Sequence, residues 1–165
     1  MKVVCIKMNK PNLYIFVGAP ASGKSYWAEH HMNEHTKWIS RDAIRFSIMK
    51  ENDDYFQNES KVYKTFIHQI QEALDSGFDV FADATHINWA SRSKLLNALH
   101  LDNVNVNCIV FKAPLELCEQ RNIARPGLAC VPAKILRNMY GRTQHPKTDP
   151  YKYNKIITIK TGDET

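Results

Sequence analysis

The sequence has 165 residues, of which 44% are hydrophobic and 24% charged, and this balance is ordinary for a water-soluble globular protein. We expect a single domain over residues 1–165 and no membrane-spanning segment, because no apolar run approaches the ~20 residues that a bilayer requires. The net charge of +5 favours polyanionic partners electrostatically, but it does not identify them.

The chain begins with a short stretch, residues 1–6, that is soon interrupted by polar residues and does not resemble a secretory signal. A cytoplasmic location is therefore expected. The four cysteines are widely spaced and form no C-x-x-C pair, which argues against a zinc site or a dithiol redox motif.

A glycine-rich loop follows the first predicted strand. Residues 13–17 form an apolar run that predicts a buried strand, and residues 26–30 are compatible with a helix. Between them, residues 18–25 fill every fixed position of the phosphate-binding pattern G-x-x-x-x-G-K-[ST]. Strand, loop and helix occur in the order that this motif requires, so a chance Lys-Ser after a turn is a poor explanation.

The backbone N–H groups of such a loop surround an anion, and the next helix adds the positive end of its dipole. Lys24 is expected to reach the β- and γ-phosphates of a nucleoside triphosphate, and the Ser25 hydroxyl to bind Mg²⁺. The predicted loop contacts to the nucleotide are Gly18, Ala19, Pro20, Ala21, Ser22, Gly23, Lys24 and Ser25.

The second predicted strand, residues 37–40, leads into Asp42 and Arg45. Asp42 is the leading candidate for a general base that takes the proton from an acceptor hydroxyl. Arg45 lies three residues later, on the same face of a helix, and can hold a phosphate of the acceptor. Alternatively, Asp42 only caps a helix over residues 43–49, and the two roles can coexist.

The middle of the chain alternates between helix and strand. Apolar residues at helical spacing predict a helix over residues 60–76, and residues 78–82 predict a third strand that ends at Asp83. A carboxylate at this place can position Mg²⁺, as strand-end carboxylates do in phosphate-loop enzymes. It can instead orient Ser25 through a hydrogen bond, or act as an ordinary turn residue.

Two arginines mark a candidate lid. Residues 91–101 predict a helix, residues 104–111 a fourth strand and residues 114–121 another helix. Arg121 and Arg125 are spaced to share one helix face, and Pro126-Gly127 marks a turn where a lid can hinge. Their guanidinium groups would neutralise charge on a transferred phosphoryl group. The alternative is a solvated basic helix face.

The last elements complete an alternating pattern. Residues 132–140 predict a helix and residues 155–159 a fifth strand. The alternation indicates a three-layer α/β fold of the phosphate-loop, adenylate kinase-like type, with a mostly parallel sheet of about five strands. Ligands bind at the carboxyl ends of such strands, so the phosphate loop, Asp42 and Asp83 are expected to converge.

The phosphate loop does not by itself specify a reaction. The sequence has no N-K-x-D motif for reading guanine, and Asp83 is followed by Ala84 instead of the glutamate that motor and transporter ATPases carry there. Because that water-activating carboxylate is missing, a transferase that excludes water fits better than a hydrolase.

Four motifs in the correct order resemble those of the 5′-hydroxyl polynucleotide kinase family, which includes the kinase domain of bacteriophage polynucleotide kinase-phosphatase. Over residues 12–140, the phosphate loop, the general-base segment 40–45, the Asp-Ala-Thr strand end 83–85 and the lid arginines are similar. The sequence departs from the family at His86, where Asn is usual. Residues 142–147 do not align, which leaves the adenine contacts unassigned.

The resemblance implies transfer of the γ-phosphate of ATP to the 5′-OH end of DNA or RNA, with Mg²⁺, during end healing. In that reaction Asp42 would activate the 5′-hydroxyl and Arg45 would hold the acceptor 3′-phosphate. The candidate catalytic residues are Lys24, Asp42, Arg45, Arg121 and Arg125, of which the last two also contact the nucleotide, and the candidate metal ligands are Ser25 and Asp83.

No phosphatase or ligase sequence follows, so separate proteins are expected to supply those steps. Two other interpretations stay open. A kinase of a small metabolite or nucleoside would use the same Asp42 and Arg45, and a non-catalytic ATP-binding module would need only the phosphate loop. The sequence leaves the oligomeric state open.

Overall fold

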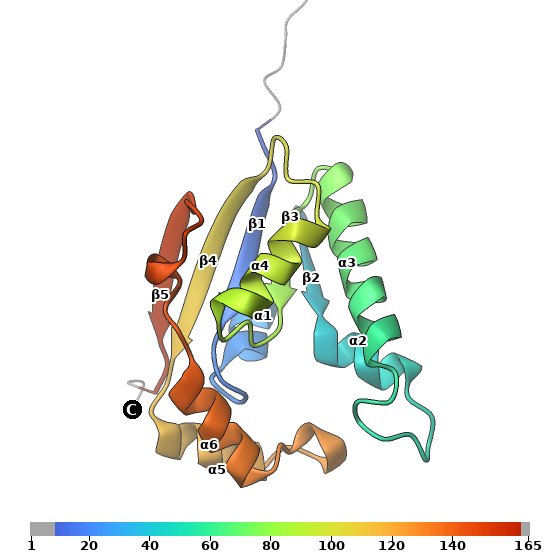
Figure 1. Cartoon of the computed structure of the whole chain (residues 1–165), viewed down its shortest axis with the longest axis vertical. Helices are drawn as coiled ribbons and strands as arrows, with labels where there is room; N and C mark the ends of the chain where they lie inside the picture. The colour runs from blue at the N-terminus through green and yellow to red at the C-terminus, as the bar shows by residue number, and fades with distance from the viewer. Residues whose placement is uncertain (1–8, 163–165) are drawn as a thin grey trace, which may run out of the picture.

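The computed structural model describes residues 9–162, which form a five-stranded sheet flanked by helices (Figure 1). Residues 1–6, where no secretory signal is expected, lie outside this range. The strands are β1 (Asn12–Val17), β2 (Thr36–Ser40), β3 (Asp79–Asp83), β4 (Asn105–Lys112) and β5 (Lys155–Lys160). The helices are α1 (Lys24–His31), α2 (Arg41–Ile48), α3 (Glu59–Asp75), α4 (Trp89–Ala98), α5 (Leu115–Ile123) and α6 (Ala133–Arg142).

The sheet has the strand order β2-β3-β1-β4-β5, and every paired strand is parallel. The three-layer α/β fold expected from the sequence is therefore confirmed, with an all-parallel sheet in place of a mostly parallel one. Each predicted strand agrees with its observed bounds to within one residue at either end. The apolar runs were informative because strands of a parallel sheet are buried on both faces.

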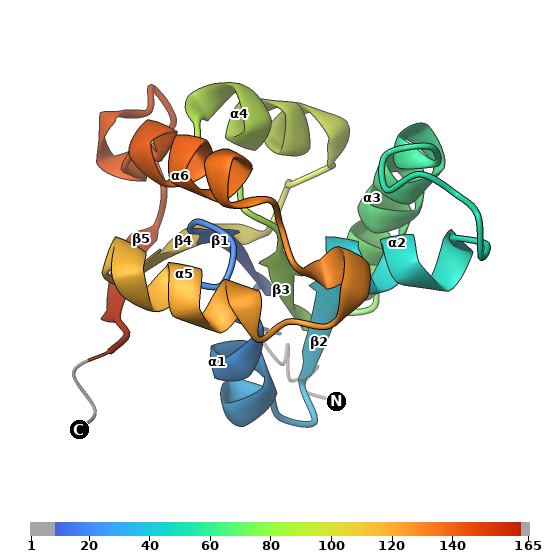
Figure 2. The ribbon, with the colours of Figure 1, turned by 90° about the horizontal axis from the view of Figure 1, so that it is seen from below.

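The two faces of the sheet are covered by different helices. Successive side chains of a strand point to opposite faces, so Ile15 of β1 joins the cluster that contains α3 and α4, whereas Phe16 packs with Ala28 of α1. Figure 2 shows α4 and α1 on opposite sides of the sheet. Because β1 is the central strand and α1 follows it directly, the phosphate loop between them lies at the carboxyl end of this strand.

Helices α5 and α6 lie beyond the carboxyl ends of the strands (Figure 1). Cys118 of α5 and Leu136 of α6 are buried in a small cluster of their own, together with Ala113 after β4. The Tyr140 hydroxyl donates a hydrogen bond of 2.8 Å to the Ala113 carbonyl oxygen. The helix pair is therefore attached to the end of β4, and the segment between α5 and α6 extends toward α2 (Figure 2).

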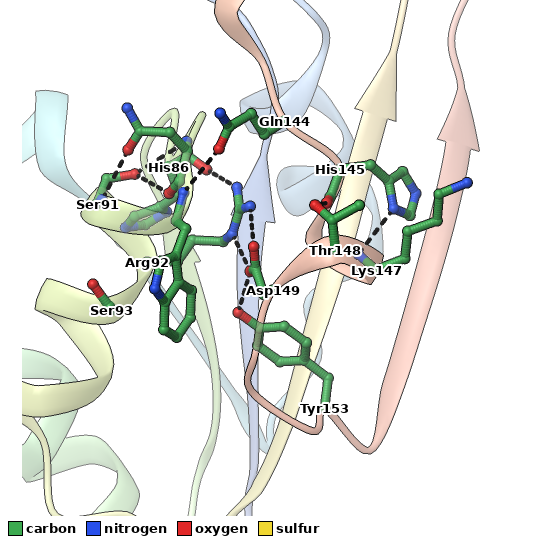
Figure 3. Close-up of polar contacts among 12 residues, drawn as sticks. His86, Ser91, Arg92, Ser93, Gln144, His145, Lys147, Thr148, Asp149 and Tyr153 are labelled. Atoms are coloured by element: carbon green, nitrogen blue, oxygen red, sulfur yellow. Dashed lines mark hydrogen bonds and ion pairs between the residues drawn. The ribbon is translucent and has the colours of Figure 1, made fainter.

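A buried ion pair fixes the segment between α6 and β5 (Figure 3). Arg92 of α4 donates to both carboxylate oxygens of Asp149, at 2.6 and 2.7 Å, and the two side chains are 0% and 1% exposed. Arg92 also donates to the His86 carbonyl oxygen at 2.7 Å, and Tyr153 donates to Asp149 at 2.8 Å. These contacts place the chain that follows the unaligned residues 142–147 against the start of α4.

The Arg92–Asp149 pair gives a stability prediction. Asp149→Ala leaves a buried guanidinium without its counter-charge, so the free energy of unfolding is expected to fall by about 3–5 kcal/mol. Urea denaturation measures this change. The control is Glu119→Ala, which breaks an exposed pair with Arg137 and is expected to cost at most about 1 kcal/mol. Equal, small losses in the two variants would contradict a structural role for the buried pair.

Candidate nucleotide and acceptor site

The phosphate loop adopts a backbone that needs glycine at two positions. A Cβ atom at Gly18 would lie 2.7 Å from the Ser22 hydroxyl oxygen, and Gly23 has a φ of +98°. Ala21 also has a positive φ of +61°, which an L-residue adopts only at a cost in backbone strain. The Gly18 N–H donates to the Thr85 carbonyl oxygen at 3.0 Å, which ties the loop to the segment after β3.

Lys24 folds back over the loop that precedes it. Its Nζ donates to the carbonyl oxygens of Gly18 and Ala19 at 3.0 and 2.7 Å, and the residue is only 8% exposed. Burial lowers the pKa of Lys24, while the negative charges of Asp83 and Asp42 oppose this shift. The ammonium group is thus poorly solvated, and the negative charge of a bound polyphosphate would compensate for the lost hydration.

Asp83 accepts a hydrogen bond from Ser25, as one of the three interpretations of this residue expects. The Ser25 hydroxyl donates to Asp83 Oδ2 at 2.9 Å, and the Trp38 indole N–H donates to the same oxygen at 2.9 Å. Asp83 is 5% exposed, and burial raises its pKa while Lys24 opposes the shift. A serine hydroxyl and a partly uncompensated carboxylate are oxygen donors that suit Mg²⁺, an ion that keeps several of its waters. Residues 9–162 contain no group of three or more His, Cys, Asp or Glu that would form an all-protein metal site.

Asp42 is not the helix cap. Ser40 is the N-cap of α2, and its side chain accepts from the Ala43 N–H at 3.2 Å, while Asp42 lies in the first turn. Asp42 Oδ1 accepts hydrogen bonds from Arg45 at 2.5 Å and from the Tyr55 hydroxyl at 2.8 Å. The side chain of Asp42 is therefore held by Arg45 and Tyr55 and does not cap the start of α2.

Arg45 is enclosed by neighbouring side chains. The residue is 4% exposed, and its two terminal nitrogens donate to Asp42 and to Tyr55 on one side and to Glu59 on the other. Glu59 also pairs with Arg41. The Nε atoms of Arg41 and Arg45 are buried without a hydrogen-bond partner in the described part of the chain. Nε is thus the one nitrogen of the Arg45 guanidinium that donates to no group in the described part of the chain.

The two arginines of the candidate lid separate instead of sharing a helix face. Arg121 lies in the last turn of α5, and its Nη1 is 3.5 Å from the Thr161 hydroxyl and equally close to the place that a Cβ of Gly23 would occupy. Arg125 follows the end of α5, and its Nη2 lies 3.8 Å from Asp42 Oδ2. Arg121 therefore faces the phosphate loop, and Arg125 faces the candidate base.

Four residues of this region have no role in the sequence analysis. Trp38 donates a hydrogen bond to Asp83. Tyr55 donates to Asp42, and Glu59 accepts from Arg45. The Thr161 hydroxyl donates to the Ser22 carbonyl oxygen at 2.9 Å. None of them belongs to a motif, and each is far in sequence from at least one residue that it contacts. The sequence carries no local signal that would have found them.

His86, the departure from the resembled family, is a buried neutral side chain. It has a positive φ of +40°, and its Nδ1 lies 2.9 Å from the Phe16 carbonyl oxygen, which makes Nδ1 the protonated nitrogen. Burial lowers the pKa of His86 to about 4, and nearby Arg41 and Lys24 add to this shift. Its visible role is to connect the segment after β3 to the end of β1.

Residues 13–146 match the AAA domain family. The chain belongs to this family. It is 31% identical over 160 residues to the L-seryl-tRNA(Sec) kinase of Methanococcus maripaludis, a match that covers 92% of this chain and 60% of that protein. Together with the all-parallel sheet and the loop geometry, membership establishes a phosphate-loop kinase fold.

Solved structures share the fold at low sequence identity. A chain of the Pnkp1/Rnl/Hen1 RNA repair complex matches with a TM-score of 0.73 and 20% identity, over 92% of this chain and 50% of that one. A sugar kinase from Janibacter sp. HTCC2649 matches with a TM-score of 0.58 and 16% identity, over 92% and 85%. The chain thus spans about half to three fifths of the seryl-tRNA kinase and the repair-complex chain. No helix within residues 9–162 is long and apolar enough to cross a membrane.

The depressed pKa of His86 gives a pH prediction. The folded protein binds this proton only near pH 4, whereas the unfolded chain binds it near pH 6.5, so acid favours unfolding between these values. The contribution is fully present above about pH 6.5, and we expect roughly 3 kcal/mol of it to be lost as the pH falls to 4. Urea denaturation across this range measures the slope, and His86→Asn should flatten it. An unchanged slope in that variant would contradict the assignment.

Proposed function

We propose that the chain is an ATP-dependent phosphotransferase whose acceptor is the 5′-hydroxyl end of DNA or RNA. The observation that carries the proposal is the arrangement of two halves around one charge cluster. The loop with Lys24 and Arg121 forms the donor half, and Asp42 with Arg125 beside it forms the acceptor half. Lys24 is near enough to Asp42 for the negative charge of Asp42 to oppose the lowering of the Lys24 pKa.

In the donor half, the loop N–H groups and Lys24 would bind the triphosphate of ATP. Arg121 lies at the edge of the loop, close to Gly23, where a guanidinium can neutralise charge that develops during transfer. Ser25 and Asp83 would hold Mg²⁺, which supplies charge neutralisation on the phosphate oxygens when bound. The donor-half roles are shared by many phosphate-loop kinases and do not select an acceptor.

In the acceptor half, Asp42 would take the proton of the attacking hydroxyl. Asp42 Oδ2 accepts no hydrogen bond in the described part of the chain, because Arg125 at 3.8 Å is too distant for one. Arg45 keeps one buried, unpaired N–H, and a phosphate of the acceptor would satisfy it. This contact supports the expectation that the acceptor carries an anionic group beside its hydroxyl.

A second candidate acceptor has direct support. The 31% identity to an L-seryl-tRNA(Sec) kinase favours the hydroxyl of a seryl group carried on tRNA. Both candidate acceptors contain a nucleic acid, in keeping with the net charge of +5. Because a sugar kinase is among the similar structures, a small metabolite is the third candidate acceptor.

Transfer from γ-labelled ATP decides among these acceptors. The protein is offered 5′-OH oligonucleotides of DNA and RNA, seryl-tRNA and a panel of sugars, each at several concentrations. Label on an oligonucleotide supports the proposal, and label on seryl-tRNA alone or on a sugar alone replaces it. Tight ATP binding with no transfer to any acceptor would favour a non-catalytic module.

Two substitutions distinguish the contribution of the donor half from that of the acceptor half. Asp42→Asn should lower kcat by ~10²–10⁴ with unchanged ATP binding, because it removes the base and keeps the shape of the side chain. Lys24→Ala should lower both ATP affinity and kcat, since its charge contacts the phosphates in the ground and transition states. Isothermal titration and initial rates measure these changes.

The matched control for Asp42→Asn is Asp102→Asn. Asp102 is an exposed carboxylate between α4 and β4, so its loss should leave kcat unchanged. Wild-type turnover by Asp42→Asn would remove Asp42 from the mechanism.

A further inference from the structure

Tyr55 lies in the segment between α2 and α3 and contacts both members of the Asp42–Arg45 pair. Its hydroxyl donates to Asp42 Oδ1 at 2.8 Å and accepts from Arg45 Nη1 at 2.9 Å. Its ring lies against the guanidinium of Arg45, with 4.4 Å between the guanidinium carbon and the ring centroid. Tyr55 therefore closes a triangle of polar contacts and covers one face of Arg45.

These contacts make the two oxygens of the Asp42 carboxylate unequal. Oδ1 accepts one hydrogen bond from Arg45 and one from Tyr55, so both of its lone pairs in the carboxylate plane are used. Oδ2 has only the distant Arg125 nitrogen beside it, at 3.8 Å. Only Oδ2 can receive a proton without first breaking a hydrogen bond.

We propose that Tyr55 is a positioning residue that fixes the Asp42 carboxylate with Oδ2 toward the acceptor hydroxyl. This inference rests on the proposed phosphotransferase function. In the reaction, the acceptor O–H bond breaks and its proton passes to Oδ2, while the acceptor oxygen bonds to the γ-phosphorus and the bond to ADP breaks. The proton leaves Asp42 for solvent after product release.

The chemistry of Tyr55 suits this role. Burial raises the pKa of Tyr55 to about 12, and the negative charge of Asp42 adds to the shift, so the hydroxyl stays a donor throughout the working range of pH. Without Tyr55, Asp42 would keep the single contact from Arg45 and could rotate about its Cβ–Cγ bond. The carboxylate would then present a misaligned oxygen for part of the time, which lowers the rate without weakening ground-state binding.

The test compares Tyr55→Phe with Tyr63→Phe. Both changes remove one hydroxyl from a half-buried tyrosine, but the Tyr63 hydroxyl of α3 donates to the Lys94 carbonyl oxygen of α4 and not to Asp42. Tyr55→Phe is expected to lower kcat about 10-fold, with the KM values for ATP and acceptor within two-fold of wild type. Tyr63→Phe should match wild type. A wild-type kcat for Tyr55→Phe, or a loss that appears only in KM, overturns the proposal.

A double-mutant cycle adds a readout that general loss of structure would not produce. Because Tyr55 is proposed to act through Asp42, Tyr55→Phe should cause no further loss in the Asp42→Asn background. Independent, multiplying losses would overturn the proposal. If the wild type transfers phosphate and Tyr55→Phe does so equally well, only the role of Tyr55 fails. If the wild type transfers to no acceptor, the proposed function fails and this inference with it.

Discussion

Two buried opposite charges at the carboxyl ends of β1 and β3 are the interaction around which the site is built. Lys24 follows β1 and Asp83 ends β3, and both are largely removed from water. Burial lowers the pKa of Lys24 and raises the pKa of Asp83, so it favours the neutral form of both side chains. The charge of each side chain opposes the shift in the other. The pair is stable only because loop carbonyl oxygens, Ser25 and Trp38 supply hydrogen bonds. A polyphosphate and a divalent cation are the additions that such a site favours most.

The acceptor half depends on a second set of charges, which is attached to the first through the sheet. β2 pairs with β3, so the start of α2 lies beside the end of β3, and Asp42 comes near Lys24. Glu59 and Tyr55 then fix Arg45 and Asp42 from the far side. Arg125 approaches from the segment after α5 and completes the surroundings of the candidate base. The surroundings of the Asp42 carboxylate thus come from α2, from the chain around Tyr55 and from the segment after α5.

Two buried arginines within residues 9–162 differ in how completely their nitrogens are paired. Arg92 makes three hydrogen bonds to Asp149 and the His86 carbonyl oxygen. Arg45 retains a buried N–H without a partner, although burying such a group costs free energy. Every guanidinium nitrogen of Arg92 has a partner, and these contacts fix the segment around Asp149. A ligand group that hydrogen-bonds to the unpaired Nε of Arg45 would remove this cost, and that nitrogen belongs to the side chain that pairs with the candidate base Asp42.

The sequence determined the elements and their order. The apolar runs predicted all five strands, because parallel strands are buried on both faces, and the phosphate loop was identified from glycine and lysine at fixed spacing. It also named Asp42 and Asp83, because ligands bind where parallel strands end, and it named the two arginines from their helical spacing and the Pro-Gly turn that follows them. The roles assigned to those residues stay predictions until they are measured.

Only the tertiary structure decided how these side chains meet. Local sequence left Asp42 as either cap or base, and the fold assigns the cap to Ser40. Helical spacing placed Arg121 and Arg125 on one face, but α5 ends between them and directs them to different halves of the site. Trp38, Tyr55, Glu59 and Thr161 carry no motif, since their contacts come from elements far apart in the chain. Spacing along a chain specifies local geometry, whereas the partners of a buried charge depend on which segments the sheet brings together.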